Sequence, residues 1–199
     1  MIITRTPLRI SFVGGGSDQP AFYADEPGMV VSAAIDKYVY LTINRKYDGA
    51  VRVSYSKTEN VDRAHEVEHP LVRACLGMAN IRSGVEITSI ADVPAGTGLG
   101  SSSAFTVGLL AGLFAYQGEY HNAESLADAA CHVEIGMCHA PIGKQDQYAA
   151  AYGGLRCYTF QPDQVNTEVI ALPADALAQF QSRLLLLDTG IRRAANVIL

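Results

Sequence analysis

The sequence contains no tryptophan, no pair of cysteines at C-x-x-C spacing and no excess of basic residues. Its four cysteines are dispersed. Cys131 and Cys138 lie one heptad apart on a predicted helix, which favours buried free thiols over a metal site. The 15 Lys and Arg residues against 20 Asp and Glu residues give a formal net charge of -5. That balance supplies no electrostatic reason to bind nucleic acid or an anionic membrane, so an anionic ligand has to be held by local groups.

Long hydrophobic runs are absent as well. The longest apolar, helix-like stretch extends from Ala104 to Tyr116, which is too short to cross a bilayer and includes Thr106 and two glycines. Met1–Arg5 leads directly into a strand-like pattern, so the sequence predicts no signal peptide. A length of 199 residues and a hydrophobic content of 49% suit one globular domain, or two. The expected compartment is the cytoplasm.

Glycines cluster at two places in the sequence, residues 96–100 and residues 14–16. In the first, Gly96, Gly98 and Gly100 alternate through a loop that begins at Pro94 and leads into the three serines 101–103. Alternating glycines allow a ligand to approach the backbone closely, and the serines offer hydroxyls and an N-cap where the apolar helix begins. The free N–H groups and positive dipole of such a helix start suit a phosphate. A glycine-rich turn that only caps a core helix is the alternative, and the three serines favour the phosphate site.

The second glycine-rich place is Gly14–Gly16, followed by Ser17 and Asp18. Three consecutive glycines leave room for a ligand or for a tight turn. Ser17 or Asp18 could cap a short helix over residues 19–23, and the Asp18 carboxylate could instead accept hydrogen bonds from sugar hydroxyls. Upstream, Arg9 stands on the strand face opposite Leu8 and Ile10, as a solvated arginine or as a functional one.

Hydrophobic patterning predicts a mixture of strands and helices. Expected strands cover 2–5 and 8–13, separated at Pro7, then an antiparallel run over 29–35, 38–45 and 50–55 with a hairpin turn at 47–49, then 84–90, the region of Tyr158, 165–172 and a buried segment at 184–187. Expected helices cover 70–79, the stretch after the loop to about 116, 122–134 with Asn122 as its cap, and 174–179. Residues 191–199 begin a helix-like pattern that stops on three apolar residues, so we expect a longer protein of which this chain is the N-terminal part.

Three motifs in order resemble those of the GHMP small-molecule kinases, named for galactose, homoserine, mevalonate and phosphomevalonate kinases. The central one is P-x-G-x-G-L-G-S-S-S-A at 94–104. The others are T-P-L-R-I-S-F-V-G-G-G-S-D at 6–18 and G-K-Q-D-Q-Y-A-A at 143–150, followed by two glycines at 153–154. The first and last motifs in the chain resemble kinases acting on D-glycero-D-manno-heptose 7-phosphate. Fucose kinases begin similarly, whereas the G-E-H-x-D element of galactokinases is absent here.

The resemblance implies an α+β fold. Residues 1–185 would form the family's N-terminal ATP-binding domain, which is similar to domain 2 of ribosomal protein S5. Residues 186–199 would begin a truncated, ferredoxin-like C-terminal domain that is otherwise absent. The family's G-A-G-x-G-G element, which belongs to that C-terminal half, is also absent, so part of the active site would come from outside this chain.

The resemblance also implies ATP-dependent phosphoryl transfer to a sugar phosphate. The ATP phosphates would be held by Pro94, Gly96, Thr97, Gly98, Leu99, Gly100, Ser101, Ser102 and Ser103. Mg²⁺ would lie near Ser102 or Ser103 and near Glu134, whose alternative interpretation is a solvated helix glutamate. Asp146 would orient or deprotonate the acceptor hydroxyl while Arg9 steadies both the acid and the transferring group, the alternative for Asp146 being a loop cap. The sugar would be faced by Gly15, Gly16, Ser17 and Asp18. A fucose or other sugar 1-kinase, or a binding protein without catalysis, are the alternative functions.

Overall fold

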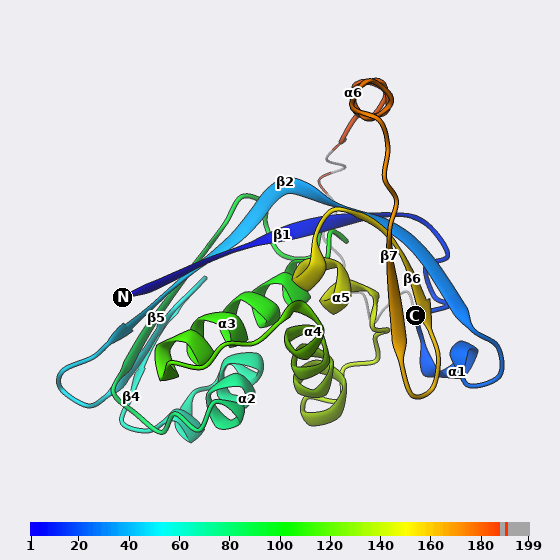
Figure 1. Ribbon diagram of the computed structural model, residues 1–199. Helices are drawn as coiled ribbons and strands as arrows, with labels where there is room; N and C mark the ends of the chain where they lie inside the picture. The colour runs from blue at the N-terminus through cyan, green and yellow to red at the C-terminus, as the bar shows by residue number, and fades with distance from the viewer. Residues whose placement is uncertain (188–189, 191–199) are drawn as a thin grey trace.

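A computed structural model describes residues 1–187 and Gly190. Within that part of the chain a seven-stranded sheet carries helices on one face, and α6 lies away from that helix layer, with Phe180 against Phe12 of β1 (Figure 1). The strands are β1 (Ile2–Val13), β2 (Gly28–Arg45), β3 (Val51–Ser54), β4 (Thr58–Val61), β5 (Val85–Ala91), β6 (Leu155–Phe160) and β7 (Val165–Val169). The helices are α1 (Pro20–Tyr23), α2 (Pro70–Met78), α3 (Ser101–Gln117), α4 (Ala123–Cys131), α5 (Gln145–Tyr152) and α6 (Ala174–Ser182), with a 3₁₀ turn at Ala64–Glu66 and a π-helical turn at His132–Met137. The predicted α+β fold is confirmed.

The long strand β2 is the centre of the sheet. It pairs antiparallel with β1, with β6 over Gly28–Ala33 and with β5 over Val39–Arg45. The register against β1 shifts between Pro7 and Arg9, which face Tyr38 and Ala34, and β2 bends there (Figure 1). The predicted break at Pro7 is wrong, because β1 is one strand from Ile2 to Val13. Within the described chain β1 pairs only with β2, and an edge strand tolerates a proline. The two strands predicted over 29–45 are likewise one.

The hairpin predicted at residues 47–49 is also wrong. Strand β3 does not pair with β2, because β5 lies between them and pairs parallel with β3, Val51 facing Val85. Strand β3 forms its antiparallel pair with the next strand, β4. The residues at 47–49 do form a turn, but β5, which follows about thirty residues after β3 in the sequence, occupies the position beside β2.

Helix α3 is the core of the domain. Ten of its residues are buried, and it packs against β1 and β2 on one side and against α2, α4 and α5 on the other sides. Gly108 and Gly112 allow this close approach, since a Cβ at those positions would lie 2.4 Å from Thr6 Oγ1 and 2.3 Å from Ile43 Cδ1. A helix that is apolar on all sides is one that is covered on all sides. This packing fixes where the first turn of α3 lies relative to β1.

Other predictions have mixed outcomes. The helix at 70–79 is confirmed as α2, and Asn122 caps α4 by accepting the Ser125 N–H at 2.8 Å. The buried strand predicted at 184–187 is wrong, because these residues form no strand and Leu185 is 82% exposed. All four cysteines are free, and two of them, Cys75 and Cys131, are buried. The predicted helix-like pattern at 191–199, and with it nearly all of the proposed segment 186–199, lies outside the described residues.

Candidate active site

The loop between β5 and α3 ends at an open helix start. Gly96, Gly98 and Gly100 have φ angles of 76°, 74° and 73°, in the left-handed region that favours glycine. Gly100 itself is the N-cap residue and no side chain caps the helix, so the prediction of a serine N-cap is wrong. Within the described chain no group accepts a hydrogen bond from the backbone N–H of residues 101–103. These donors, together with the helix dipole, form an anion-binding end.

Arg9 joins this loop to a carboxylate that is remote in sequence. Its backbone N–H donates to the Leu99 carbonyl at 3.0 Å, and its Nη1 donates to the Gly98 carbonyl at 2.6 Å. Its Nε donates to Asp146 Oδ1 at 2.7 Å, and Nη2 lies 2.6 Å from the same oxygen. The Arg9 side chain is only 13% exposed. The alternative of a solvated strand arginine is therefore wrong.

Asp146 lies in the first turn of α5, directly beside the start of α3. A Cβ on residue 100 would lie 3.4 Å from Asp146 Cγ and 3.2 Å from Arg9 Cγ, so glycine is needed for this approach. Burial raises the pKa of the Asp146 carboxyl, the Arg9 charge and hydrogen bond lower it, and the Asp18 charge raises it again. The net raised pKa makes this carboxylate a better proton acceptor than an ordinary aspartate. Asp146 belongs to the helix and is not the loop cap considered as its alternative.

Glu134 is 1% exposed in the π-helical turn that follows α4. Its carboxylate accepts hydrogen bonds from three hydroxyls of α3: Ser102 at 2.9 Å, Ser103 at 2.7 Å and Thr106 at 3.2 Å. The Gln147 side-chain amide of α5 is a fourth donor. Burial raises the pKa of Glu134, and these hydrogen bonds oppose the rise. A solvated glutamate, the alternative interpretation, is excluded by this burial.

The same residues fit a magnesium ion in part. Ser102 is exposed at the uncapped start of α3, and its hydroxyl donates a hydrogen bond to Glu134 Oε1. Mg²⁺ typically takes one or two carboxylates, with phosphate oxygens and water as the remaining ligands. Among the described residues no three His, Cys, Asp or Glu side chains cluster to form a metal cage. One hydroxyl and one carboxylate beside the uncapped helix end would suit a metal that arrives with a bound phosphate.

The glycine-rich turn before α1 is folded differently from the prediction. Neither Ser17 nor Asp18 caps α1, whose N-cap is Gln19 without a side-chain hydrogen bond. The Ser17 hydroxyl lies 2.7 Å from the Gly14 carbonyl and accepts the Met29 N–H at 3.0 Å. Asp18 is 7% exposed. Of the four residues expected to face the sugar, Gly15 and Gly16 are exposed. The side chains of Ser17 and Asp18 instead make hydrogen bonds to the backbone of the protein.

Sequence reasoning missed the two glutamines beside Asp146. Gln145 and Gln147 are 5% and 0% exposed, and Gln147 connects α5 to Glu134 and so to α3. The signal was available, because both lie within the motif quoted for Asp146 and are polar residues at the start of an alanine-rich helix. Their burial depends on neighbours more than ten residues away, which local patterning does not reveal.

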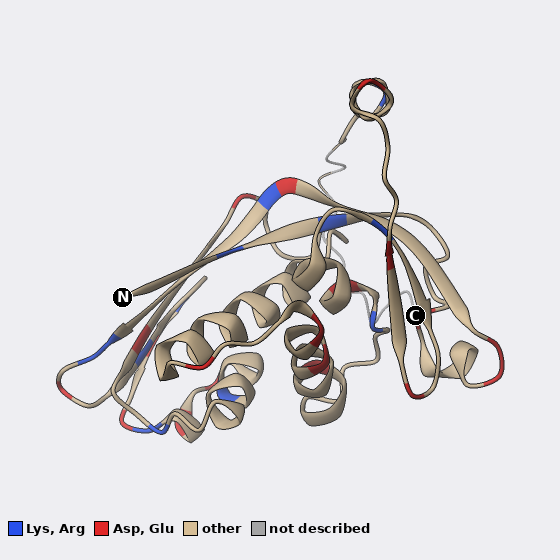
Figure 2. Ribbon diagram, viewed as in Figure 1, with Lys and Arg blue, Asp and Glu red and all other residues tan. Residues whose placement is uncertain are grey.

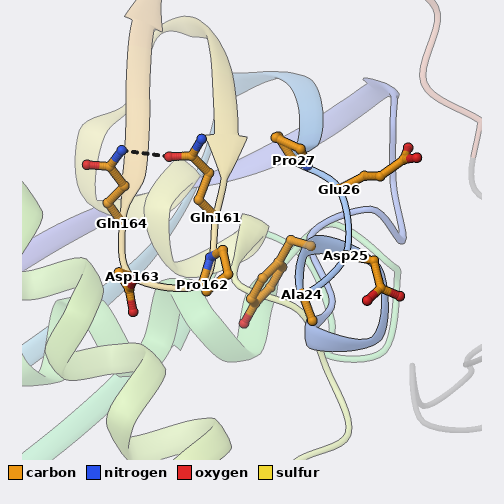
Figure 3. A pocket seen from close by; sticks show the side chains of 9 residues that line it. Ala24, Asp25, Glu26, Pro27, Gln161, Pro162, Asp163 and Gln164 are labelled. Atoms are coloured by element: carbon orange, nitrogen blue, oxygen red, sulfur yellow. Dashed lines mark hydrogen bonds between the residues drawn. The ribbon is translucent and has the colours of Figure 1, made fainter.

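Two hollows in the described surface lie away from these residues. One of about 440 Å³ lies between the connection from α1 to β2 and the turn between β6 and β7 (Figure 3). Its lining residues include Asp25, Glu26 and Asp163, whose negative charges disfavour a phosphate there. Lys and Arg residues of the described chain are scattered and not gathered on one face (Figure 2). Positive potential for an anion therefore comes from the start of α3 and from Arg9. No helix in the described residues is long and apolar enough to span a membrane.

Comparisons with known proteins agree with this geometry. Residues 61–154 match the family model described as GHMP kinases N terminal domain. The chain is 28% identical to the D-glycero-alpha-D-manno-heptose 7-phosphate kinase of Campylobacter jejuni, over 99% of this chain and 62% of that protein. It is 26% identical to the bifunctional fucokinase/GDP-fucose pyrophosphorylase of Arabidopsis thaliana, over 97% of this chain and 20% of that protein.

The fold is shared with solved structures. A crystal structure of a D-glycero-D-manno-heptose 1-phosphate kinase from Bacteroides thetaiotaomicron superposes with a TM-score of 0.81 at 26% identity, covering 87% of this chain and 61% of that one. The chain thus spans about three fifths of the length of the heptose kinases it matches. Together with the three ordered motifs, these matches show that the chain contains a GHMP kinase N-terminal domain.

Proposed function

We propose that this chain is the ATP-binding part of a sugar kinase, which transfers the γ-phosphoryl group of ATP to a sugar hydroxyl. The observation that carries the proposal is the Asp146–Arg9 pair beside Gly100, at the uncapped start of α3. A phosphate bound at that helix end would lie next to Asp146, a half-buried acid with a raised pKa. Phosphoryl transfer needs this combination of a positioned phosphate and an oriented nucleophile.

The nucleotide would be bound by the loop from Pro94 and Gly96 to Ser103. Backbone N–H groups at the start of α3 would hold the phosphates, and the left-handed glycines would let the phosphates approach. Ser102 and Glu134 would hold Mg²⁺, which supplies neutralisation of phosphate charge when bound. Residues 1–185 would form this ATP-binding unit, and residues 186–199 would begin the next domain.

Asp146 would accept the proton of the acceptor hydroxyl or orient that hydroxyl toward the phosphorus. Arg9, fixed by two carbonyls of the loop, would keep the acid in place and share its charge with the transferring group. The acceptor would enter beside Gly15 and Gly16, which are exposed. No covalent intermediate with the protein is required.

The acceptor we propose is D-glycero-D-manno-heptose 7-phosphate, phosphorylated at its anomeric hydroxyl. Support comes from the printed names of two relatives at 28% and 26% identity and from the motifs at 6–18 and 143–150. The second candidate is a fucose 1-kinase, which the 26% identity to the Arabidopsis fucokinase favours.

The test is ATP consumption by the full-length protein with a panel of sugars and sugar phosphates. We expect turnover with heptose 7-phosphate to exceed that with fucose and other sugars. Turnover with fucose alone would select the second candidate. Calorimetry with ATP·Mg²⁺ beside a product assay separates binding from catalysis, and binding without any product would identify a non-catalytic relative and overturn the proposal.

A further inference from the structure

Helix α5, which carries Asp146, has no cap of its own. Its N-cap residue, Lys144, makes no side-chain hydrogen bond to the first turn. The N–H of Gln145 is instead satisfied by Asp18 Oδ2, at 3.0 Å and across 127 residues of chain. Asp18, which lies shortly after β1, therefore does what an N-cap aspartate does within its own helix. It provides a hydrogen-bond acceptor and a negative charge at the positive end of the helix dipole.

The other polar atoms of Asp18 hold the same two segments together. Oδ1 accepts the Gly16 N–H at 3.0 Å, and the Asp18 carbonyl accepts the Lys144 N–H at 3.2 Å. Gly143 completes the contact, because a Cβ there would lie 1.9 Å from Asp18 Oδ2. With 7% of its surface exposed, the carboxylate is committed to backbone donors of the protein. Two of the three family motifs thus meet at one side chain.

We infer that Asp18 is a positioning residue for Asp146: it caps α5 from outside the helix and holds the acid against Arg9 and Gly100, and it does not itself bind the sugar. This inference rests on the proposed kinase function. Asp146 follows Gln145 directly, so loosening the first turn of α5 moves the reacting carboxyl. A displacement of about 1 Å at a reacting group is enough to lower the rate by about 10²-fold.

The experiment compares Asp18→Asn, Asp18→Ala and Gly143→Ala in the full-length protein. We expect kcat to fall by about 10- to 100-fold in Asp18→Asn and further in Asp18→Ala, with KM for ATP and for the sugar within about twofold of the wild type. Asparagine keeps one acceptor oxygen, so it should rescue part of the loss. Gly143→Ala keeps the carboxylate but displaces it, and we expect it to behave like Asp18→Asn. A sugar KM raised more than about tenfold with kcat unchanged would make Asp18 a sugar ligand and overturn the inference.

Two further readouts separate positioning from general damage to the fold. Asp146 is faced by the Arg9 guanidinium from β1 and by the Asp18 carboxylate, while α3 presents the uncharged Gly100. Because the Asp18 charge raises the pKa of Asp146, Asp18→Asn should shift the acid limb of the kcat profile to lower pH, and Gly143→Ala should shift it less. In an Asp146→Asn background, Asp18→Asn should cost no further activity. A full additional loss there would show that Asp18 acts independently of Asp146.

Amide hydrogen exchange keeps the inference testable if the kinase proposal fails. The Gln145 amide should exchange faster in Asp18→Asn than in the wild type, while amides in the middle of α3 remain protected. Absence of turnover in the wild type would contradict the proposed kinase function, and hydrogen exchange at Gln145 would still test whether Asp18 caps α5. Unchanged protection of Gln145 would remove the cap.

Discussion

Two helix N-termini meet at the candidate site, and they are finished in opposite ways. The start of α3 has a glycine as its N-cap, no side-chain cap and unpartnered N–H groups in the described chain. The start of α5 is closed, because the Asp18 carboxylate occupies the Gln145 N–H and the neighbouring glutamines are buried. The free N–H groups at a helix N-terminus can bind a ligand, or they can donate to a side chain of the protein itself. In the proposed kinase the open end would bind the phosphate, and the closed end would fix the acid beside it.

This contrast predicts that the largest single loss comes from the reacting group on the closed helix. Asp146→Asn keeps size and shape but removes the proton acceptor, so we expect kcat to fall by about 10²–10⁴-fold. ATP·Mg²⁺ affinity, measured by calorimetry, should stay within about threefold because α3 is unchanged. Asp175→Asn in the first turn of the exposed helix α6 is the matched control and should have no effect. Turnover near the wild-type rate would remove Asp146 from the mechanism.

Arg9 joins the two helix starts, and its loss should come next in size. Arg9→Gln leaves the loop carbonyls and Asp146 without their shared cation, and we expect kcat to fall by about 10²–10³-fold. The guanidinium lowers the pKa of Asp146, so its removal should move the acid limb of the pH–kcat profile to higher pH. That direction is opposite to the shift expected for Asp18→Asn. If Arg9→Gln and Asp18→Asn both shift the acid limb of the pH–kcat profile in the same direction, that limb does not arise from titration of the Asp146 carboxyl.

The open end of α3 can be tested with two glycines of the same helix. Gly100 and Gly118 both have left-handed φ angles, 73° and 82°, so alanine at either should destabilise the fold by about 1–2 kcal/mol. Only residue 100 lies against Arg9 and Asp146, whereas a Cβ at 118 meets nothing within 4 Å. We expect Gly100→Ala to weaken ATP·Mg²⁺ binding by about tenfold more than Gly118→Ala, a difference of ~1.4 kcal/mol. Equal affinities in the two variants would place the nucleotide elsewhere.

The open end was predictable from the sequence, and the closed end was not. Gly96, Gly98 and Gly100 followed by serines form a local pattern, and the conformations they need follow from the residues themselves. Only the cap was assigned wrongly, because Gly100 takes the N-cap position predicted for a serine.

The closed end depends on contacts between segments distant in sequence. Asp18 reads as a helix cap for residues 19–23 because its neighbours suggest one, yet it caps a helix 127 residues away. The inserted strand β5 shows the same limit on a larger scale, since no local turn signal at 47–49 reveals that β5 separates β2 from β3. Local patterning predicts α2 and the Asn122 cap correctly, whereas the Arg9–Asp146 contact is expected only from the family resemblance.

The smallest expected effect tests whether the two helix starts are also coupled in stability. Gln147 donates to Glu134, which in turn accepts three hydroxyls of α3, and it is fully buried. Gln147→Leu removes one donor from a buried carboxylate, so we expect the free energy of unfolding in urea to fall by about 1–3 kcal/mol with only a few-fold change in kcat. Gln164→Leu, which breaks an exposed bond to Gln161, is the control and should stay within about 0.5 kcal/mol of the wild type. A stable Gln147→Leu variant with a large loss of kcat would instead mean that Gln147 acts on Asp146 and does not serve to link α5 to α3.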